Sequence, residues 1–189
     1  MLRSVKVSDR SPRVFPMRQV RYNCAMSLDG YIAGPDHEFD WIEADPDIDF
    51  LQLSAQFDTY LMGRKTFEIT RQHGQAEMPG IRTFVFSRTL RQSDYDNVTI
   101  VGRNWQEIVQ SLRREPGKDI WLFGGGSLFR SLAEAGLVDT VEVSVVPILL
   151  GRGVPLVSDP PTRIALTLTG HRVYAKTGMI SLVYAVNNR

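Results

Sequence analysis

The sequence is poor in the residues that build disulfides and metal clusters. One cysteine, Cys24, and three histidines occur among 189 residues. A single cysteine excludes an intramolecular disulfide, and Cys24 lies in an apolar run where a structural thiol is expected. The histidines are scattered as His37, His73 and His171. These counts exclude a zinc cluster, so the sequence predicts no metal site.

The sequence also lacks an excess of positive or negative charge, and it lacks a long hydrophobic run. Lys and Arg number 22 against 21 Asp and Glu, which gives a net charge of +1. Non-specific nucleic-acid binding needs a clear basic excess, and no apolar stretch approaches the length that spans a bilayer. The first 16 residues are basic and polar, without the apolar core of a secretory signal. We therefore expect a cytoplasmic protein that binds neither nucleic acid nor membrane.

The composition that is present suits one folded domain. Hydrophobic residues make up 43% of the chain, enough to build a core in a domain of ordinary size. We expect a disordered tail over residues 1–18, with Met17 as an alternative start of the chain, and a single domain over residues 19–189.

Hydrophobic periodicity predicts the fold class. Strands and helices alternate from Gln19 to Leu137, and the apolar strand Ile120–Phe123 is typical of the middle of a parallel sheet. Beyond residue 140, apolar and polar residues alternate with period two, and a turn at Lys176–Gly178 precedes a last strand, Met179–Val186. The pattern predicts an α/β fold: a mixed, mostly parallel twisted sheet flanked by helices, with an antiparallel C-terminal hairpin.

Capping residues predict where two of the helices begin. Asp45 followed by Pro46 is typical of an N-cap and a first helical residue. Asn104, with Glu107 three residues later, predicts a capping box at the start of another helix.

Glycine ends two predicted strands immediately before a helix begins. Free N–H groups and the positive end of the dipole make a helix start an anion site, and glycine lets a phosphate approach closely. The candidate residues are Gly63, Arg64, Lys65 and Thr66 in the first turn and Gly124, Gly125, Gly126 and Ser127 in the second.

A third candidate, Ser87 with Arg88, directly follows the predicted strand Thr83–Phe86. Arginine binds phosphate in a bidentate manner, so Arg88 with Arg64 or Lys65 suits the 2′-phosphate of an adenosine ribose. Each signal is weak by itself, because the glycine spacings of Walker and Rossmann sequences are missing. All three turns follow separate predicted strands, at the sheet edge where α/β proteins bind ligands. Together they predict NADPH rather than NADH.

Five segments resemble the dihydrofolate-reductase-like superfamily, and they occur in that superfamily's order. Three resemble the helix start, the Ser-Arg turn and the triple-glycine turn of dihydrofolate reductases. Two are similar to motifs of the reductase domain of riboflavin biosynthesis, the RibD C-terminal domain, in a stand-alone form. The segments are Met62–Glu68, Phe86–Arg88, Gly124–Phe129, Ser27–Ala33 and Val145–Leu156, and the resemblance spans Val20–Val186.

The resemblance implies a dihydrofolate-reductase-like fold with NADPH across the C-terminal edge of the sheet. The first glycine turn and the Ser-Arg turn would hold the adenosine phosphates. The triple-glycine turn, with Ser127 and Leu128, would hold the pyrophosphate. Ala25 and Ile32 would contact the nicotinamide, and Gly34–Trp41 would be a mobile loop that closes over the cofactor.

For the substrate, the resemblance implies a pyrimidine- or pteridine-like heterocycle such as 5-amino-6-(5-phosphoribosylamino)uracil. Dihydrofolate reduction and a non-catalytic NADP(H)-binding module are the alternatives. Phe50 is a candidate to stack on folate, but Leu51 occupies the better-aligned position, which weakens the folate interpretation. The zinc deaminase signature of the bifunctional riboflavin enzymes is absent, so at most their reductase half is present.

Two acidic residues are candidates for delivering the proton. By its spacing from the first glycine turn, Asp47 is the nearest equivalent of the acidic residue with which dihydrofolate reductases contact the pterin, and Asp49 is its rival. Asp29 is the second candidate. Both have a structural alternative, because an Asp in the first helical turn interacts with the dipole and Asp-Gly is a tight-turn pair.

A phosphorylated substrate needs a second cationic site, for which Arg71 and Arg152 are candidates. The apolar C-terminal strands and the stretch Pro147–Pro155 predict a buried subunit contact. Related reductase domains often pair, so we expect a homodimer.

Overall fold

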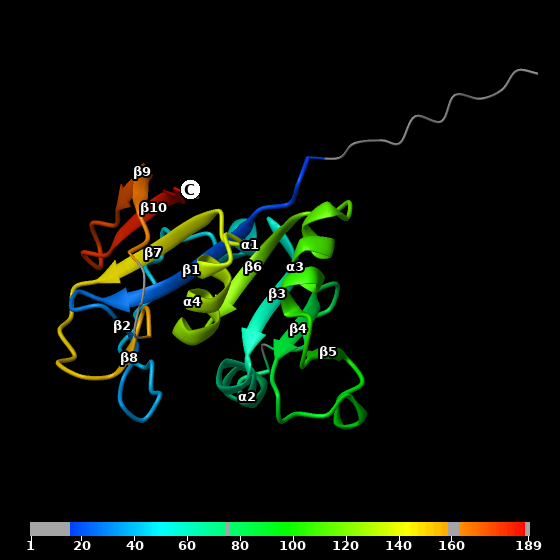
Figure 1. Cartoon of the computed structure of the whole chain (residues 1–189). Helices are drawn as coiled ribbons and strands as arrows, with labels where there is room; N and C mark the ends of the chain where they lie inside the picture. The colour runs from blue at the N-terminus through cyan, green and yellow to red at the C-terminus, as the bar shows by residue number, and fades with distance from the viewer. Residues whose placement is uncertain (1–15, 75, 159–162, 188–189) are drawn as a thin grey trace, which may run out of the picture.

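A computed structural model describes residues 16–74, 76–158 and 163–187. Figure 1 shows a twisted sheet with helices on both faces. The elements in chain order are β1 (Val20–Ser27), β2 (Tyr31–Ala33), α1 (Phe50–Ser54), β3 (Phe57–Gly63), α2 (Arg64–Gln72), β4 (Arg82–Phe86), the 3-10 turn η1 (Gln92–Asp94), β5 (Val98–Val101), α3 (Trp105–Arg114), β6 (Asp119–Gly124), α4 (Gly126–Glu134), β7 (Thr140–Val146), β8 (Val154–Pro155), β9 (Leu166–Val173) and β10 (Ile180–Val186). None of these helices has the length and apolar character that a membrane span requires.

The main sheet has eight strands in the order β5-β4-β3-β6-β1-β7-β10-β9. The six strands from β5 to β7 are parallel, whereas β10 runs antiparallel to both β7 and β9. This arrangement confirms the predicted mixed sheet with its C-terminal hairpin. A small second sheet, in which β2 pairs with β8, was not predicted.

Each face of the main sheet has its own core, because side chains alternate along every strand. Helices α3 and α4 cover one face through Val109, Leu112, Phe129 and Leu132, which pack on Val20, Tyr22, Leu61 and Leu122. On the other face, Phe67 of α2 joins Phe57, Tyr60 and Met62 of β3, with Leu53 of α1 at its border. In Figure 1, α3 and α4 lie in front of the sheet and α1 lies behind it.

The predicted helix start at Asp45 and Pro46 is wrong. Helix α1 begins at Phe50, and the Asp49 side chain caps it by accepting from the Gln52 N–H at 2.8 Å. Asp45 is buried and accepts from the backbone N–H and the hydroxyl of Thr177 at 3.1 and 2.9 Å. The Asp45 carboxylate therefore ties this loop to the turn before β10 instead of starting a helix.

The predicted capping box is also wrong, although the helix does begin after Asn104. Asn104 has a left-handed backbone with φ of 52°, and its side chain makes no capping hydrogen bond. An N-cap side chain reaches the next turn from an extended backbone, a geometry that the left-handed conformation removes.

The folded part of the chain begins one residue earlier than predicted. Arg18 is 3% exposed, pairs with Asp58 and donates to the Thr59 hydroxyl at 2.8 Å. Its backbone N–H also bonds the Arg113 carbonyl at 2.9 Å. Arg18 therefore belongs to the domain, whereas most of the predicted tail, residues 1–15, lies outside the described residues.

Candidate functional site

A cavity of about 1910 Å³ runs along the face of the sheet that carries α1 and α2. Pockets for single small ligands usually enclose roughly 300–1000 Å³, so this one has room for a dinucleotide together with a second molecule. Its floor is built by alternate residues of neighbouring strands, and its rim by the turns that follow β3, β4 and β6.

The turn between β3 and α2 opens onto this cavity. Gly63 is the N-cap of α2 and offers no side chain to cap the helix, so the first N–H groups lack a side-chain partner. Gly63, Arg64, Lys65 and Thr66 all line the cavity. In Figure 1, α2 lies just beyond the arrowhead of β3.

The turn between β6 and α4 repeats this arrangement. Gly125 is the N-cap of α4, again with no side-chain capping bond, and it lines the cavity with Gly126, Ser127 and Leu128. Gly124 has φ of +130°, which favours glycine, and the peptide bond between Gly124 and Gly125 is cis. Gly124 is the one predicted residue of this turn that does not line the cavity.

The two glycine turns nearly touch. A Cβ built on Gly63 would lie 3.7 Å from the Gly125 nitrogen, and one built on Gly125 would lie 3.4 Å from the Thr66 hydroxyl. The parallel register explains this closeness, because Met62 pairs with Gly124 across β3 and β6. Two uncapped helix starts therefore face one space, an arrangement that suits phosphate groups.

The Ser-Arg turn joins them from the other side of β3. Gly63 pairs with Phe86, so Ser87 and Arg88 follow β4 at the same level of the sheet. The Ser87 hydroxyl accepts from the N–H groups of Thr89 and Leu90, both at 3.1 Å. The hydroxyl thus shapes the turn, while the exposed Arg88 remains as the turn's charged group at the cavity.

Four cations line this end of the cavity: Arg64, Lys65, Arg88 and Arg103. Arg64 already binds Glu68 one helical turn away, with distances of 2.9 and 3.1 Å to the two carboxylate oxygens. Within the described residues, Lys65, Arg88 and Arg103 make no ion pair. Sequence reasoning missed Arg103, although the Gly102-Arg103 pair that directly follows β5 was a usable signal.

The sequence matches the profile of the RibD C-terminal domain over residues 18–179. The chain belongs to the RibD C-terminal domain family. It is also 38% identical over 183 residues to the uncharacterised protein YyaP of Bacillus subtilis (strain 168), a match that covers 90% of this chain and 96% of YyaP.

Three solved structures show the same fold as this RibD C-terminal domain. A candidate riboflavin biosynthesis protein from Shewanella sp. PV-4 has a TM-score of 0.76 at 24% identity, covering 90% of this chain and 99% of that one. The deaminase/5-amino-6-(5-phosphoribosylamino)uracil reductase of Thermotoga maritima has a TM-score of 0.68 at 15% identity. The match covers 90% of this chain and 57% of that protein. Dihydrofolate reductase from Enterococcus faecalis, complexed with NADP(H), has a TM-score of 0.65 at 16% identity. The match covers 90% of this chain and 97% of the reductase. The predicted dihydrofolate-reductase-like fold is confirmed.

In this RibD C-terminal domain, the predicted nicotinamide contacts Ala25 and Ile32 line the cavity beyond the glycine turns. The stretch Gly34–Trp41 borders the same region through His37 and Phe39. It is folded back on itself, because the Gly34 N–H bonds the Glu38 carbonyl at 2.8 Å. The Phe39 ring meets the His73 ring edge to face at 5.1 Å, which joins the loop to the end of α2.

Neither predicted catalytic carboxylate lines the cavity. Asp47 is half exposed and pairs with Lys176 at 2.7 Å. Asp29 accepts from the Ser27 hydroxyl at 2.6 Å and from the Gly151 N–H at 2.7 Å. Their contacts give both residues structural roles, and their catalytic roles stay predictions. The rival of Asp47, the helix-capping Asp49, does line the cavity.

The far end of the cavity combines aromatic rings with polar groups. The rings of Tyr60 and Phe123 flank the Trp121 ring at 5.4 and 5.2 Å between centroids. Asn23 and Glu142 lie on the same floor. Sequence reasoning missed both residues. Each is a polar residue that alternates with apolar ones along a predicted strand, which was a usable signal that it lies on the other face of the sheet.

Glu142 is buried beside Arg21 and is the acidic group of this floor. Arg21 donates to its two carboxylate oxygens at 2.6 and 2.8 Å. Burial by itself raises the pKa of the Glu142 carboxyl, but the bonds from Arg21, Thr140 and Asn23 outweigh burial and hold the pKa below its ordinary value. Glu142 is therefore ionised at neutral pH and is not a proton donor.

The predicted substrate-phosphate residues do not lie at this end. Arg71 pairs with Glu77 at 3.7 Å, and neither Arg71 nor Arg152 lines the cavity. Arg172 of β9 does, with its guanidinium 4.6 Å from the centroid of the Tyr174 ring. Phe50 and Leu51 both line the cavity from α1 and are exposed, so the structure leaves both in reach of a bound ring.

Proposed function

We propose that this protein is an NADPH-dependent reductase of a pyrimidine- or pteridine-like heterocycle. One observation carries the proposal: a single cavity joins two uncapped helix starts and four cations at one end to an aromatic, hydrogen-bonding floor at the other. The first end suits a phosphorylated dinucleotide, and the second suits a planar polar ring.

The residues present fit NADPH. Apart from the Thr66 hydroxyl, a Cβ at Gly125 would enter open space, so the glycine leaves a cradle for a phosphate. The N–H groups that begin α2 and α4 would hold the pyrophosphate and the adenosine phosphates. Arg88, with Lys65 and Arg103, would hold the 2′-phosphate, because Arg64 is already paired with Glu68. When bound, NADPH supplies the hydride.

The residues of the chain itself orient the reaction. Ala25 and Ile32 would flank the nicotinamide, and Trp121 and Phe123 would pack against the substrate ring. Among the acidic residues, Asp49 is better placed than Asp47 or Asp29 to relay a proton through water, because it faces the cavity. Arg172 suits a phosphate at the substrate end.

The family supports 5-amino-6-(5-phosphoribosylamino)uracil as the first substrate to test, since the structurally similar Thermotoga maritima protein is a reductase of that compound. NADPH oxidation should be followed with this compound and with dihydrofolate. Oxidation with the uracil supports the proposal, and oxidation with dihydrofolate alone supports a folate reductase. Tight NADPH binding without oxidation by any ring would indicate a non-catalytic module. Gly125→Ala, which fills the phosphate cradle, is the control for activity from a contaminating enzyme.

A further inference from the structure

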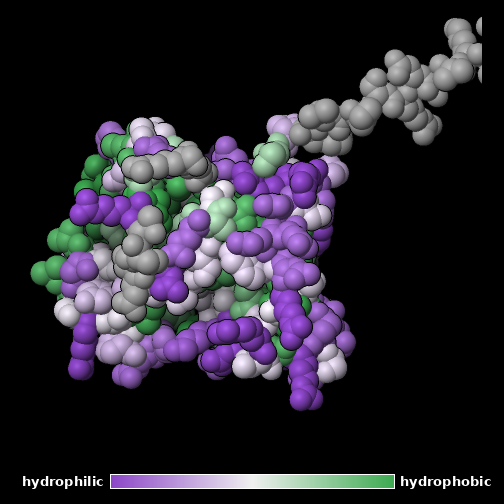
Figure 2. Space-filling view, viewed as in Figure 1, coloured by the Kyte–Doolittle hydropathy of each residue, from purple (hydrophilic) through white to green (hydrophobic). Residues whose placement is uncertain are grey.

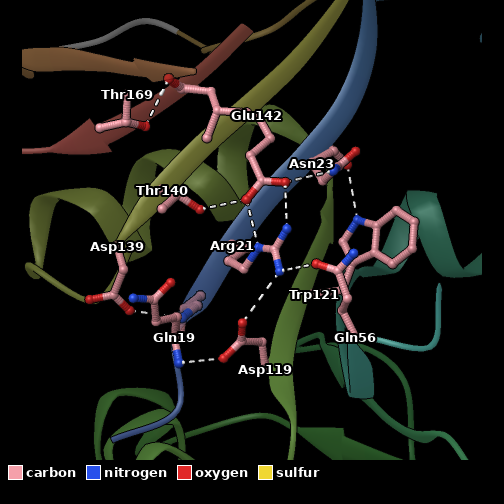
Figure 3. Close-up of polar contacts among 12 residues, drawn as sticks. Gln19, Arg21, Asn23, Gln56, Asp119, Trp121, Asp139, Thr140, Glu142 and Thr169 are labelled. Atoms are coloured by element: carbon pink, nitrogen blue, oxygen red, sulfur yellow. Dashed lines mark hydrogen bonds and ion pairs between the residues drawn. The ribbon is translucent and has the colours of Figure 1, made fainter. Parts of the chain in front are cut away.

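The floor of the cavity contains a polar network around the buried Glu142 that the proposed hydride transfer does not use. Arg21 pairs with Thr140, and Asn23 with Glu142, across the parallel strands β1 and β7. Because side chains alternate along strands, these four groups share the cavity face of the sheet. Figure 3 shows them converging on the Glu142 carboxylate.

The Glu142 carboxylate is saturated with donors. One oxygen accepts from the Arg21 Nε at 2.6 Å and the Thr140 hydroxyl at 2.9 Å. The other accepts from the Arg21 Nη2 at 2.8 Å and the Asn23 Nδ2 at 2.9 Å. A carboxylate offers about four lone-pair sites, so this group has no acceptor left for a ligand. Its remaining effect on the cavity is exerted through Asn23.

The carboxylate fixes which way the Asn23 amide points. An ionised carboxylate only accepts hydrogen bonds, so the NH₂ end of the amide must face Glu142. The Trp121 indole N–H donates to the Asn23 backbone carbonyl at 2.9 Å, which also fixes the main chain. No donor among the described residues bonds the Asn23 Oδ1, and Asn23 lines the cavity.

We propose that the Asn23 Oδ1 is a specificity-determining acceptor, positioned by Arg21 and Glu142, that selects substrates whose ring nitrogen carries an N–H donor. The proposal rests on the proposed function, because it places the substrate ring at this end of the cavity. A ring that packs on Trp121 would present its edge to Asn23, because the Trp121 indole is bonded to the Asn23 main chain. If that edge lacked N–H, the acceptor would be buried without a partner, which is unfavourable.

Two probes that differ in their N–H groups test this proposal. 5,6-Diaminouracil carries both ring N–H donors, and its 1,3-dimethyl derivative carries neither. Calorimetric titration should show the wild type binding the first roughly tenfold more tightly, in line with one net hydrogen bond. Asn23→Leu should bring the affinity ratio close to one. The methyl groups are equally bulky for both proteins, so a steric preference would survive the substitution.

Two further variants separate positioning from general loosening of the fold. In Glu142→Gln, the new amide can donate to Asn23, so the Asn23 amide is no longer held in one orientation. The affinity ratio of the two probes should therefore fall, while NADP⁺ affinity stays unchanged. Thr140→Val is the matched control. It removes another bond to the same carboxylate, but from the oxygen that Asn23 does not use, so the ratio should stay at the wild-type value.

The titrations should be run with and without NADP⁺, because the two proposals fail differently. Failure to bind NADP⁺ contradicts the proposed function, whereas the ratio reports on Asn23 in either case. An unchanged ratio in Asn23→Leu and Glu142→Gln overturns the role of Asn23 and leaves the reductase proposal standing. If Asn23→Leu does not fold, Glu142→Gln decides. Absence of binding of both rings to the wild type overturns the role of Asn23, and the NADPH-oxidation assay decides the reductase proposal separately.

Discussion

The Asp29 carboxylate fastens two distant segments, because one of its oxygens accepts from the Gly151 N–H at 2.7 Å. The other oxygen bonds the Ser27 hydroxyl at 2.6 Å and the Leu150 N–H at 3.2 Å. These bonds hold the turn after β1 against the segment that leads into β8. Ile32 and Val154, which line the cavity, follow directly on the two segments, so Asp29 supports this wall.

Asp29→Asn should therefore lower stability in a pH-dependent manner. The Ser27 hydroxyl and the N–H groups of Gly151 and Leu150 hold the pKa of Asp29 below its ordinary value. Its contribution is thus fully present above the unfolded-state pKa of about 3.9 and is lost as pH falls through the lower folded-state value. Thermal midpoints measured between pH 3 and 7 should differ most at neutral pH. Loss of turnover with unchanged midpoints would instead support a catalytic role.

Cofactor preference should depend on Arg88 more than on Arg64. Arg88→Ala should weaken NADPH binding roughly tenfold and leave NADH binding unchanged, since only NADPH has the 2′-phosphate. Arg64→Ala should cost less than about threefold, because the Arg64 guanidinium is already paired with Glu68. Fluorescence titration of both nucleotides measures this, with Arg152→Ala as the control outside the cavity. An equal loss for NADPH and NADH in Arg88→Ala would place the 2′-phosphate elsewhere.

The two glycines that begin α4 should respond differently to alanine. A Cβ at Gly126 would lie 2.9 Å from the carbonyl oxygens of Pro155 and Leu156, so backbone must move. We expect Gly126→Ala to lower the free energy of unfolding by about 1–3 kcal/mol. A Cβ at Gly125 meets only the Thr66 hydroxyl at 3.4 Å, so Gly125→Ala should fold normally and lose NADPH affinity. Urea unfolding and nucleotide titration distinguish the two, and equal effects on binding would argue against the cradle.

The sequence predicted the fold, and it predicted that the glycine turns lie at one edge of the sheet, because local signals carry both. Glycine ends β3 and β6, and parallel pairing brings the ends of these strands to one edge of the sheet. Helix starts were harder, because Asp45 has the residue type of an N-cap but is held by Thr177, more than 100 residues away. No local pattern reports such a contact.

At the aromatic end of the cavity, the sequence pattern indicates which face of each strand is polar, but it does not indicate which residues of neighbouring strands meet. The pairing of Asn23 with Glu142 depends on the register of β1 against β7, and a shift of one residue would place the two side chains on opposite faces of the sheet. Asp49 and Asp47 are two residues apart, yet one caps a helix beside the cavity and the other pairs with Lys176. Tertiary packing determines which of two neighbouring carboxylates faces the cavity, and the sequence pattern does not specify this packing.

Arg18 should matter more to stability than its position near the start of the chain indicates. Arg18→Ala leaves Asp58 without its ion-pair partner and removes a donor from the buried Thr59 hydroxyl, so we expect a loss of about 3 kcal/mol in the free energy of unfolding. The exposed neighbour provides the control, because Met17→Ala should change stability by less than about 0.5 kcal/mol. Similar urea-unfolding midpoints for the two variants would show that the contacts of Arg18 do not stabilise the fold.

Finally, we expect a homodimer formed through the C-terminal hairpin. Leu166, Leu168 and Val173 of β9 and Ile180 of β10 are each at least 39% exposed, and the strand register places all four on the face opposite the cavity. Figure 2 shows hydrophobic side chains gathered where β9 and β10 lie. An edge strand with an apolar face needs a cover, and a second copy of the chain would supply it. Leu168→Lys should shift the mass from dimer to monomer in light scattering at micromolar protein. Thr167→Lys, which adds the same charge on the other face, should stay dimeric, and a monomeric wild type would refute the prediction.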